Sequence, residues 1–122
     1  MKDLKTITLD GVDYVRADSM QELAPEVDGL KYCIVRTYSA GVFAGYIKDR
    51  NGKEGTVLNA RRLWRWNGAA SLSQLAVDGT NDPENCKFPC EVPSIDLMEI
   101  IEVIPCSEKA KKSINAVTIW EA

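Results

Sequence analysis

The sequence lacks histidine altogether, since none of its 122 residues is His. The usual general base of Ser–His and Cys–His catalysis is therefore missing, and a mixed Cys/His zinc site cannot form. The four cysteines are Cys33, Cys86, Cys90 and Cys106. Their spacing in the chain matches no strong zinc-binding pattern. We expect reduced thiols. We predict no catalytic residue, no bound metal and no cofactor, so the protein is expected not to be an enzyme.

Long apolar runs and an excess of positive charge are also lacking. The first residues, MKDLKTITLDGVDYV, contain no signal-peptide core, and no stretch reaches the ~18 apolar residues of a membrane span. The formal net charge is −3, whereas duplex nucleic acid is bound mainly through neutralised phosphates. We therefore expect a cytoplasmic protein without a membrane partner, and nucleic acid is disfavoured as a partner.

Two nucleotide-binding signatures are absent as well. The chain has neither GxxxxGK[ST] nor a GxGxxG that follows a strand. ATP hydrolysis and Rossmann-type cofactor use therefore have no motif to support them. The composition, 45% hydrophobic and 27% charged, is ordinary for a globular protein, and the length fits one ligand-binding domain over 1–122.

Turn dipeptides and alternating patterns predict an α+β fold with an antiparallel sheet. Asp10-Gly11 lies between the alternating runs of ITLDGVDYV and predicts an N-terminal hairpin. Ser39 to Gly41 and then Asn51-Gly52 separate three strand-like segments, which together form an antiparallel meander. These segments are 31–38, 42–49 and 55–66. Further strands are expected at 95–104 and 116–120.

Two or three short helices should accompany the sheet. Ser19 and Glu22 form a capping box in DSMQELAP, which predicts the first helix. Apolar residues at helical spacing in GAASLSQLAV, residues 68–77, predict the second, with Asn67 as its cap. Ser107 can cap a short turn over EKAKKS. The helices are expected to cover one face of the meander.

Three arginines lie within five residues of the segment LNARRLWRW. A regular strand would place Arg62 on one face with the two tryptophans, and Arg61 and Arg65 on the other. A bulge near Asn59 would exchange these faces. Guanidinium groups among aromatic rings either pack as structural cation–π pairs or bind a phosphate-like anion, and both interpretations stay open here.

Small residues in SAGVFAG let a ligand approach the backbone, and Tyr38 or Phe43 offers a ring for a base. The same residues also suit a plain bend. Gly68, at the start of the second helix, can present backbone N–H groups to an anion. These features together predict a pocket for a nucleotide-like molecule that is bound without turnover. The candidate ligand-binding residues are Arg36, Tyr38, Ser39, Gly41, Phe43, Asn59, Arg61, Arg62, Trp66 and Gly68.

The segments VRTYSAGVFAGYI, NARRLWRWNGAASLSQLA, CKFPCEVP and VIPC carry a resemblance to a known family. The chain resembles the phage-encoded Thoeris anti-defence proteins of the first-described kind. The resemblance implies a phage counter-defence sponge that sequesters cyclic ADP-ribose isomers made by bacterial TIR enzymes. Holding the signal intact keeps the Thoeris effector silent in the cytosol of the infected host. It also implies homodimers or higher homo-oligomers, and for some members a second site for cyclic oligonucleotides.

A pocket that encloses such a ligand needs more surface than one small domain offers. We therefore expect the polar loop 78–93 or the C-terminal segment of one chain to close over the meander of another. The alternative function is a small module that binds a protein or single-stranded nucleic acid through Trp64, Trp66 and the arginines. A metal-dependent hydrolase that uses the carboxylates of DLMEIIE is the least favoured class.

Overall fold

The computed structural model describes residues 6–9, 12–15 and 22–121 of the chain. The predicted N-terminal hairpin is confirmed: β1 (Thr6–Leu9) pairs antiparallel with β2 (Val12–Val15) as a separate two-stranded sheet. Most of the predicted capping-box helix, including Ser19, lies outside the described residues. Its last residues, 22–25, are not helical, and Leu23 instead forms an antiparallel bridge.

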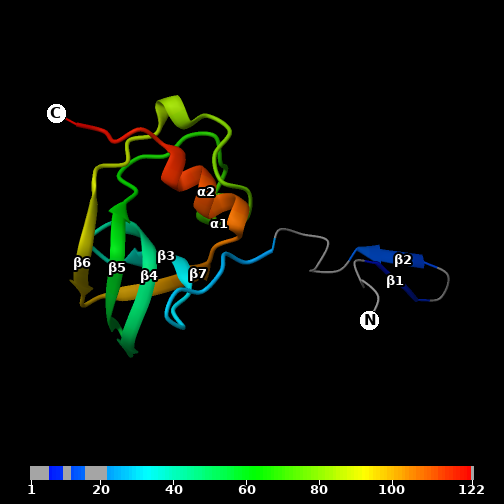
Figure 1. Cartoon of the computed structure of the whole chain (residues 1–122), viewed down its shortest axis with the longest axis horizontal. Coiled ribbons are helices and arrows are strands. Elements are labelled where there is room, and N and C mark those ends of the chain that lie inside the picture. The colour runs from blue at the N-terminus through cyan, green and yellow to red at the C-terminus, as the bar shows by residue number, and fades with distance from the viewer. Residues whose placement is uncertain (1–5, 10–11, 16–21, 122) are drawn as a thin grey trace.

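Five antiparallel strands form the main sheet, which confirms the predicted α+β class (Figure 1). The order across the sheet is β6-β5-β4-β3-β7, so the first four in this order are the predicted meander extended by one strand. The strands are β3 (Tyr32–Thr37), β4 (Val42–Asn51), β5 (Glu54–Arg62), β6 (Glu91–Leu97) and β7 (Ile100–Pro105).

The sheet is strongly curled, because its two edge strands are consecutive in the chain. Leu97 ends β6 and Ile100 begins β7, so three Cα steps of 3.8 Å, about 11 Å, are the most that can separate them. Four strand spacings in a flat sheet would require about 19 Å. The edges therefore bend toward each other, and β7 runs across β4 and β5 in the view of Figure 1.

Two cores result from this curvature. The inner core lies inside the curl and contains Cys33, Val35, Phe43, Val57, Ala60, Leu97 and Ile100. The outer core lies between the sheet and the helices, and Tyr32 and Ile34 contribute to it from β3. The predicted alternation of β3 is confirmed, since successive residues of this strand enter different cores.

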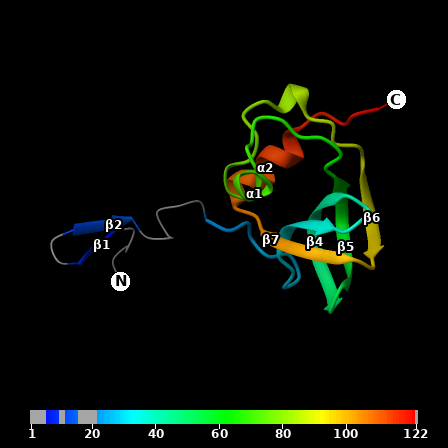
Figure 2. The same ribbon diagram turned by 180° about the vertical axis from the view of Figure 1, so that it is seen from behind.

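The helices α1 (Leu72–Asp78) and α2 (Glu108–Ala116) lie side by side on the outer face of the sheet in both views (Figures 1 and 2). The prediction that Asn67 caps this helix is wrong. The N-cap of α1 is Ser71, whose hydroxyl accepts a hydrogen bond from the backbone N–H of Gln74. Ser107 caps α2 as predicted. A 3-10 turn, η2 (Pro83–Asn85), lies in the polar loop.

Two predicted strands differ from the structure. The segment 95–104 forms parts of two strands, because the chain turns at Met98 and Glu99. Neither methionine nor glutamate is a typical turn residue. The predicted strand 116–120 is wrong as well. Helix α2 extends to Ala116, and beyond it only Ile119 forms a single parallel bridge, with Phe88. Val117 enters the outer core, and the segment does not join the main sheet.

Candidate functional site

A bulge in β5 decides where the arginines point. Asn59 has φ 51°, and the pairing of β4 with β5 shifts register there, so Asn59 and Ala60 both lie opposite Gly45. A Cβ at Gly45 would lie 2.6 Å from the carbonyl oxygen of Leu58, so glycine permits this close approach. The bulge resolves the question that the sequence left open: Arg61 points to the outer core and Arg62 toward the inner one.

Arg61 is a structural anchor. Its side chain is buried, and its guanidinium donates to backbone carbonyls of two chain segments. Nε donates to Pro89 O at 3.0 Å and Nη2 to Phe88 O at 3.0 Å. Nη1 donates to Ile114 O and Nη2 to Val117 O, both at 2.7 Å. Burial lowers the pKa of this guanidinium. Arg61 therefore fastens the polar loop to the end of α2.

Four side chains come together beyond the end of β5, beside the two segments that Arg61 joins. They are Trp64, Arg65, Lys87 and Trp120. Arg65 and Lys87 exchange backbone hydrogen bonds of 3.2 and 2.7 Å, and Trp120 N donates to Phe88 O at 3.0 Å. The rings of Trp64 and Trp120 then stack, with centroids 5.1 Å apart and an angle of 10° between the planes. Lys87 Nζ lies 5.6 Å from one ring centroid and 5.4 Å from the other.

This stacked pair is open to solvent. Trp64 is 57% exposed and Trp120 is 41% exposed, although large aromatic side chains normally lie within a core or an interface. Among the described residues, neither Arg65 nor Lys87 forms an ion pair with a carboxylate. Two cations and two indole rings are therefore available on one surface, without a partner that neutralises them in the described part of the chain.

Two adjoining cavities flank Trp120, and we call them together the Trp120 groove. The first, of about 340 Å³, is lined by Arg65, Lys87, Asn67 and Asn85 among others. The second, of about 420 Å³, extends over Ile119, Thr118 and Pro83. Both include Glu84, Cys86 and Trp120 in their walls. The sizes are those of small-molecule sites.

The amide side chains of the groove are held in place. Asp82 accepts hydrogen bonds from Nδ2 of Asn67 at 2.7 Å and from Nδ2 of Asn85 at 2.9 Å. Fixed amides of this kind can read the polar edge of a base or a ribose hydroxyl. The groove thus combines a flat apolar surface, two cations and oriented polar groups.

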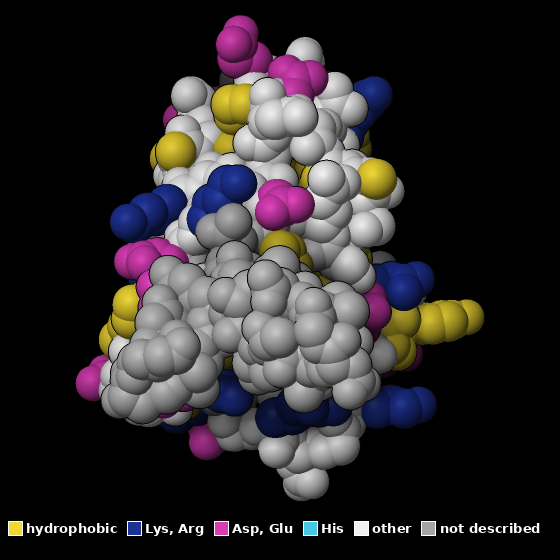
Figure 3. All heavy atoms as spheres, turned by 90° about the vertical axis from the view of Figure 1, so that its right-hand side faces the viewer, with side chains coloured by type: hydrophobic (Ala, Val, Ile, Leu, Met, Phe, Trp, Pro, Cys, Tyr) yellow, Lys and Arg dark blue, Asp and Glu magenta, His cyan; other side chains and the backbone are white. Residues whose placement is uncertain are grey.

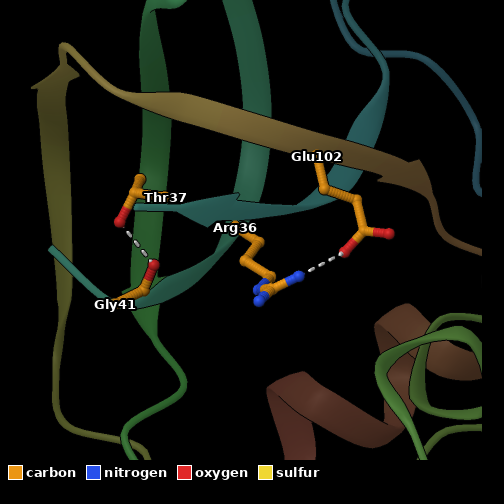
Figure 4. A network of polar contacts seen from close by, with 4 residues as sticks. All are labelled: Arg36, Thr37, Gly41 and Glu102. Atoms are coloured by element: carbon orange, nitrogen blue, oxygen red, sulfur yellow. Dashed lines mark hydrogen bonds and ion pairs between the residues drawn. The ribbon is translucent and has the colours of Figure 1, made fainter. Parts of the chain in front are cut away.

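Six of the ten sequence-predicted residues lie in or next to the β3–β4 turn instead. They are Arg36, Tyr38, Ser39, Gly41, Phe43 and Arg62. Arg36 forms an ion pair of 3.8 Å with Glu102, and the hydroxyl of Thr37 donates to Gly41 O at 2.7 Å (Figure 4). Ser39 donates to a carboxylate oxygen of Glu99 at 2.7 Å.

Arg62 completes this cluster. Its Nη1 donates to Ala40 O, and its Cζ lies 4.4 Å from the ring centroid of Phe43. Tyr38 is 77% exposed. None of the ten predicted residues lines either cavity of the Trp120 groove. The cluster at the turn is therefore a second place where a guanidinium and an aromatic ring lie together.

The other four predicted residues lie elsewhere. Asn59 is in the bulge, Arg61 is the buried anchor, and Trp66 is half-buried against the outer core. Gly68 has φ 82°, and a Cβ there would lie 2.5 Å from Thr80 Oγ1. Close packing thus explains this glycine, and it does not begin a helix. The structure does not bring these four residues to one surface.

Sequence reasoning missed Lys87 and Trp120 as site residues, and it left Arg65 among several arginines of undecided direction. Lys87 lies in CKFPC, where attention goes to the cysteines, and Trp120 was assigned to a strand. No local signal joins residues so far apart in the chain. Within one chain, loop 78–93 and the C-terminal segment both contact the end of β5 through Arg61. The closure of either segment over the meander of a second chain stays a prediction.

The described residues include no group of three or more Cys, Asp or Glu side chains arranged to hold a metal. All four cysteines are free thiols, and Cys90 is the exposed one. Burial raises the pKa of Cys33 to about 11 and that of Cys106 to about 12. Within the part of the chain that the structure describes, no helix has both the length and the apolar character needed to span a membrane.

A family model described as a domain of unknown function (DUF6948) matches residues 30–114. The match covers well over half of the chain, and the chain therefore belongs to this family. Trp64, Arg65 and Lys87 lie inside the matched region, whereas Trp120 follows it. No curated protein and no solved structure matches the chain.

Proposed function

We propose that this protein is a non-enzymatic sponge that binds a nucleotide-type anion in the Trp120 groove and holds it without cleaving it. The carrying observation is the exposed, stacked pair of Trp64 and Trp120 with Lys87 beside both rings. The ligand we propose is a cyclic ADP-ribose-type signal, as implied by the Thoeris anti-defence proteins that the chain resembles. Its retention would block activation of the Thoeris effector in the host cytosol.

The chemistry of the groove supports this proposal. A cyclic ADP-ribose isomer carries a pyrophosphate and an adenine, which call for cations and for a flat ring surface. Arg65 and Lys87 supply the cations, and Trp120 supplies the ring in the same cavity wall. Glu84 is the carboxylate among the residues that line this cavity, and the nearby carboxylate of Asp82 accepts hydrogen bonds from Asn67 and Asn85.

Tight retention of a nucleotide requires several contacts in one place. Nanomolar retention needs about 12 kcal/mol, whereas base stacking gives ~1–3 kcal/mol and a charged hydrogen bond ~1.5–3 kcal/mol. Several contacts must therefore converge. The groove is open on its outer side, because Trp64 and Trp120 are both exposed. We propose that a second copy of the chain covers it, so that the binding unit is a homodimer or a higher homo-oligomer.

The test is to mix the protein with cyclic ADP-ribose isomers, remove unbound ligand by filtration, and then release the bound ligand by heat. Intact ligand after release supports a sponge. A degraded product would show an enzyme, and the absence of any retained isomer would contradict the proposal. Sedimentation of the loaded protein measures the oligomeric state in the same preparation.

Matched variants locate the site. Lys87→Ala should weaken binding by about 10- to 100-fold, the loss expected for one charged hydrogen bond in a dry pocket. Arg50→Ala removes the same charge from the exposed hairpin at the opposite end of β5 and should leave binding unchanged. Arg62→Ala tests the cluster at the β3–β4 turn. If it abolishes binding while Lys87→Ala does not, the sequence-predicted residues form the site and the groove does not.

One observation also favours a second candidate, a module that binds single-stranded nucleic acid. Exposed tryptophans with adjacent cations are a stacking platform for successive bases. The formal net charge of −3 disfavours this function, and the face in Figure 3, which is not the side of the C-terminus in Figure 1, carries acidic as well as basic side chains. Micromolar binding of a labelled RNA with a steep salt dependence, and no response to cyclic ADP-ribose isomers, would select this function instead.

A further inference from the structure

We propose that the Trp64–Trp120 stack is a clamp that opens to take a planar base between its two indole rings. This inference rests on the proposed function, since it assigns the purine of the nucleotide to a particular place in the groove. In the structure the two rings cover one face of each other. The inserted base would replace each indole as the stacking partner of the other.

The two indoles are held very differently. Trp64 lies between Leu63, which is buried and donates its N–H to Val42 O at 2.8 Å, and Arg65, which is bonded to Lys87 through both backbone groups. Trp120 belongs to the exposed segment 118–121. The last strong anchor before this segment is Val117, whose carbonyl accepts from Arg61.

Opening therefore requires movement of the C-terminal segment alone. Beyond Val117, the backbone bond that holds Trp120 runs from its N–H to Phe88 O, at 3.0 Å. The neighbouring Ile119 is 50% exposed, so it is only partly packed. Trp64 serves as the fixed jaw of the clamp and Trp120 as the moving one.

The displacement needed is small. Stacked aromatic rings lie about 3.5 Å apart, so a base between two indoles sets their planes about 7 Å apart. The two indoles already stack, with centroids 5.1 Å apart, so their planes must separate by one further ring spacing, about 3.5 Å. Rotation of a four-residue terminal segment provides this without disturbing either core.

Insertion exchanges one aromatic contact for two. The indole pair is lost, and each of its inner faces then stacks on the base. Lys87 Nζ lies at a similar distance from both ring centroids, 5.6 and 5.4 Å, and so stands beside the gap. Lys87 can therefore contact the phosphate of a nucleotide whose base enters the clamp. This contact fixes the orientation of the ligand, with its base between the rings and its phosphate at Lys87.

Circular dichroism tests the inference, because two stacked indoles give a coupled signal that is lost when they part. The coupled signal is defined by comparing the wild-type protein with Trp64→Leu and Trp120→Leu, which each remove one exposed ring. The probes are cyclic ADP-ribose and inorganic pyrophosphate, which has no base. We expect cyclic ADP-ribose to abolish the signal in the wild type and pyrophosphate to leave it. Each variant should bind cyclic ADP-ribose about 5- to 100-fold more weakly.

The outcomes separate the clamp from the proposed function. Binding of cyclic ADP-ribose with an unchanged coupled signal would overturn the clamp and leave the sponge intact. Weakening by only one of the two substitutions would also overturn it, because the base would then rest on a single ring. If no cyclic ADP-ribose isomer binds the wild-type protein, the proposed function and the clamp fail together.

Discussion

Arg61 and Arg65 lie four residues apart in the chain and meet opposite surroundings. Around Arg61, the protein satisfies its own polar groups, since backbone carbonyls of Phe88, Pro89, Ile114 and Val117 accept from the guanidinium. In the Trp120 groove, Arg65 lines an open cavity beside exposed indoles. In the first region the guanidinium stabilises the fold. In the second, Arg65 remains available to a ligand, so substitutions in the two regions should affect stability and binding differently.

The largest effect is expected at the anchor. Arg61→Met should lower the free energy of unfolding by about 3–5 kcal/mol, because buried carbonyls lose their donor. Urea denaturation followed by circular dichroism measures this. Arg65→Met is the matched control and should change stability by less than about 0.5 kcal/mol. Equal losses in the two variants would mean that the groove is as much a part of the architecture as the anchor.

The next effect concerns the loop behind the groove. Gly68→Ala places a Cβ 2.5 Å from Thr80 Oγ1 at a positive φ, and it should cost about 2–3 kcal/mol of stability. Gly52→Ala is the control: its φ is also positive, but a Cβ there meets nothing within 4 Å, so only about 1 kcal/mol of backbone strain is expected. Thermal unfolding compares the two variants. A cost for Gly68→Ala no greater than that for Gly52→Ala would show that the loop yields easily.

A smaller effect, spread over a pH range, is expected from the buried thiols. Burial raises the pKa values of Cys33 and Cys106 in the folded protein from the ordinary thiol value of 9.0 to about 11 and about 12. The unfolded chain therefore releases these protons first, and stability should fall as the pH rises above about 9. Urea titrations in reductant at several pH values measure the slope. Cys106→Ala should flatten it, whereas Cys90→Ala, at an exposed position, should not. An unchanged slope in Cys106→Ala would contradict this assignment.

The smallest effect on stability is expected in the groove itself. Trp64→Leu removes an exposed ring from an aromatic pair, which is worth about 0.5–1.5 kcal/mol. The same substitution is expected to weaken nucleotide binding strongly. Trp64→Leu should therefore affect binding more than stability, whereas Arg61→Met should affect stability more than binding. Parallel denaturation and filtration assays check this. A loss of several kcal/mol in Trp64→Leu would make the stack a structural element.

Local patterns were enough for much of the fold. Asp10-Gly11 and Asn51-Gly52 marked two hairpins, and the strand-like residues of 31–38 predicted β3. The serine at position 107 marked the start of α2. These features depend on a few adjacent residues, and the physical rules for such short segments act within the segment itself.

The features that were mispredicted depend on distant contacts. Met98 and Glu99 turn the chain because β6 and β7 belong to opposite edges of a curled sheet, and neither residue signals a turn. The segment 116–120 has strand-like residues but no sheet edge to join, so it packs on the loop around Phe88. The predicted ligand residues lie in a turn, a bulge and the interior, and their role in binding stays a prediction.

The amino-acid order by itself determined the three meander strands, the turns between them and the presence of arginines and tryptophans without a histidine, because these follow from neighbouring side chains. Only the folded chain decided which guanidinium became an anchor, since the bulge opposite Gly45 sets the side to which Arg61 points. The meeting of Trp64 with Trp120 was likewise decided in three dimensions. It needs carbonyls from two remote segments to converge on one buried cation, and no short pattern in a sequence encodes that convergence.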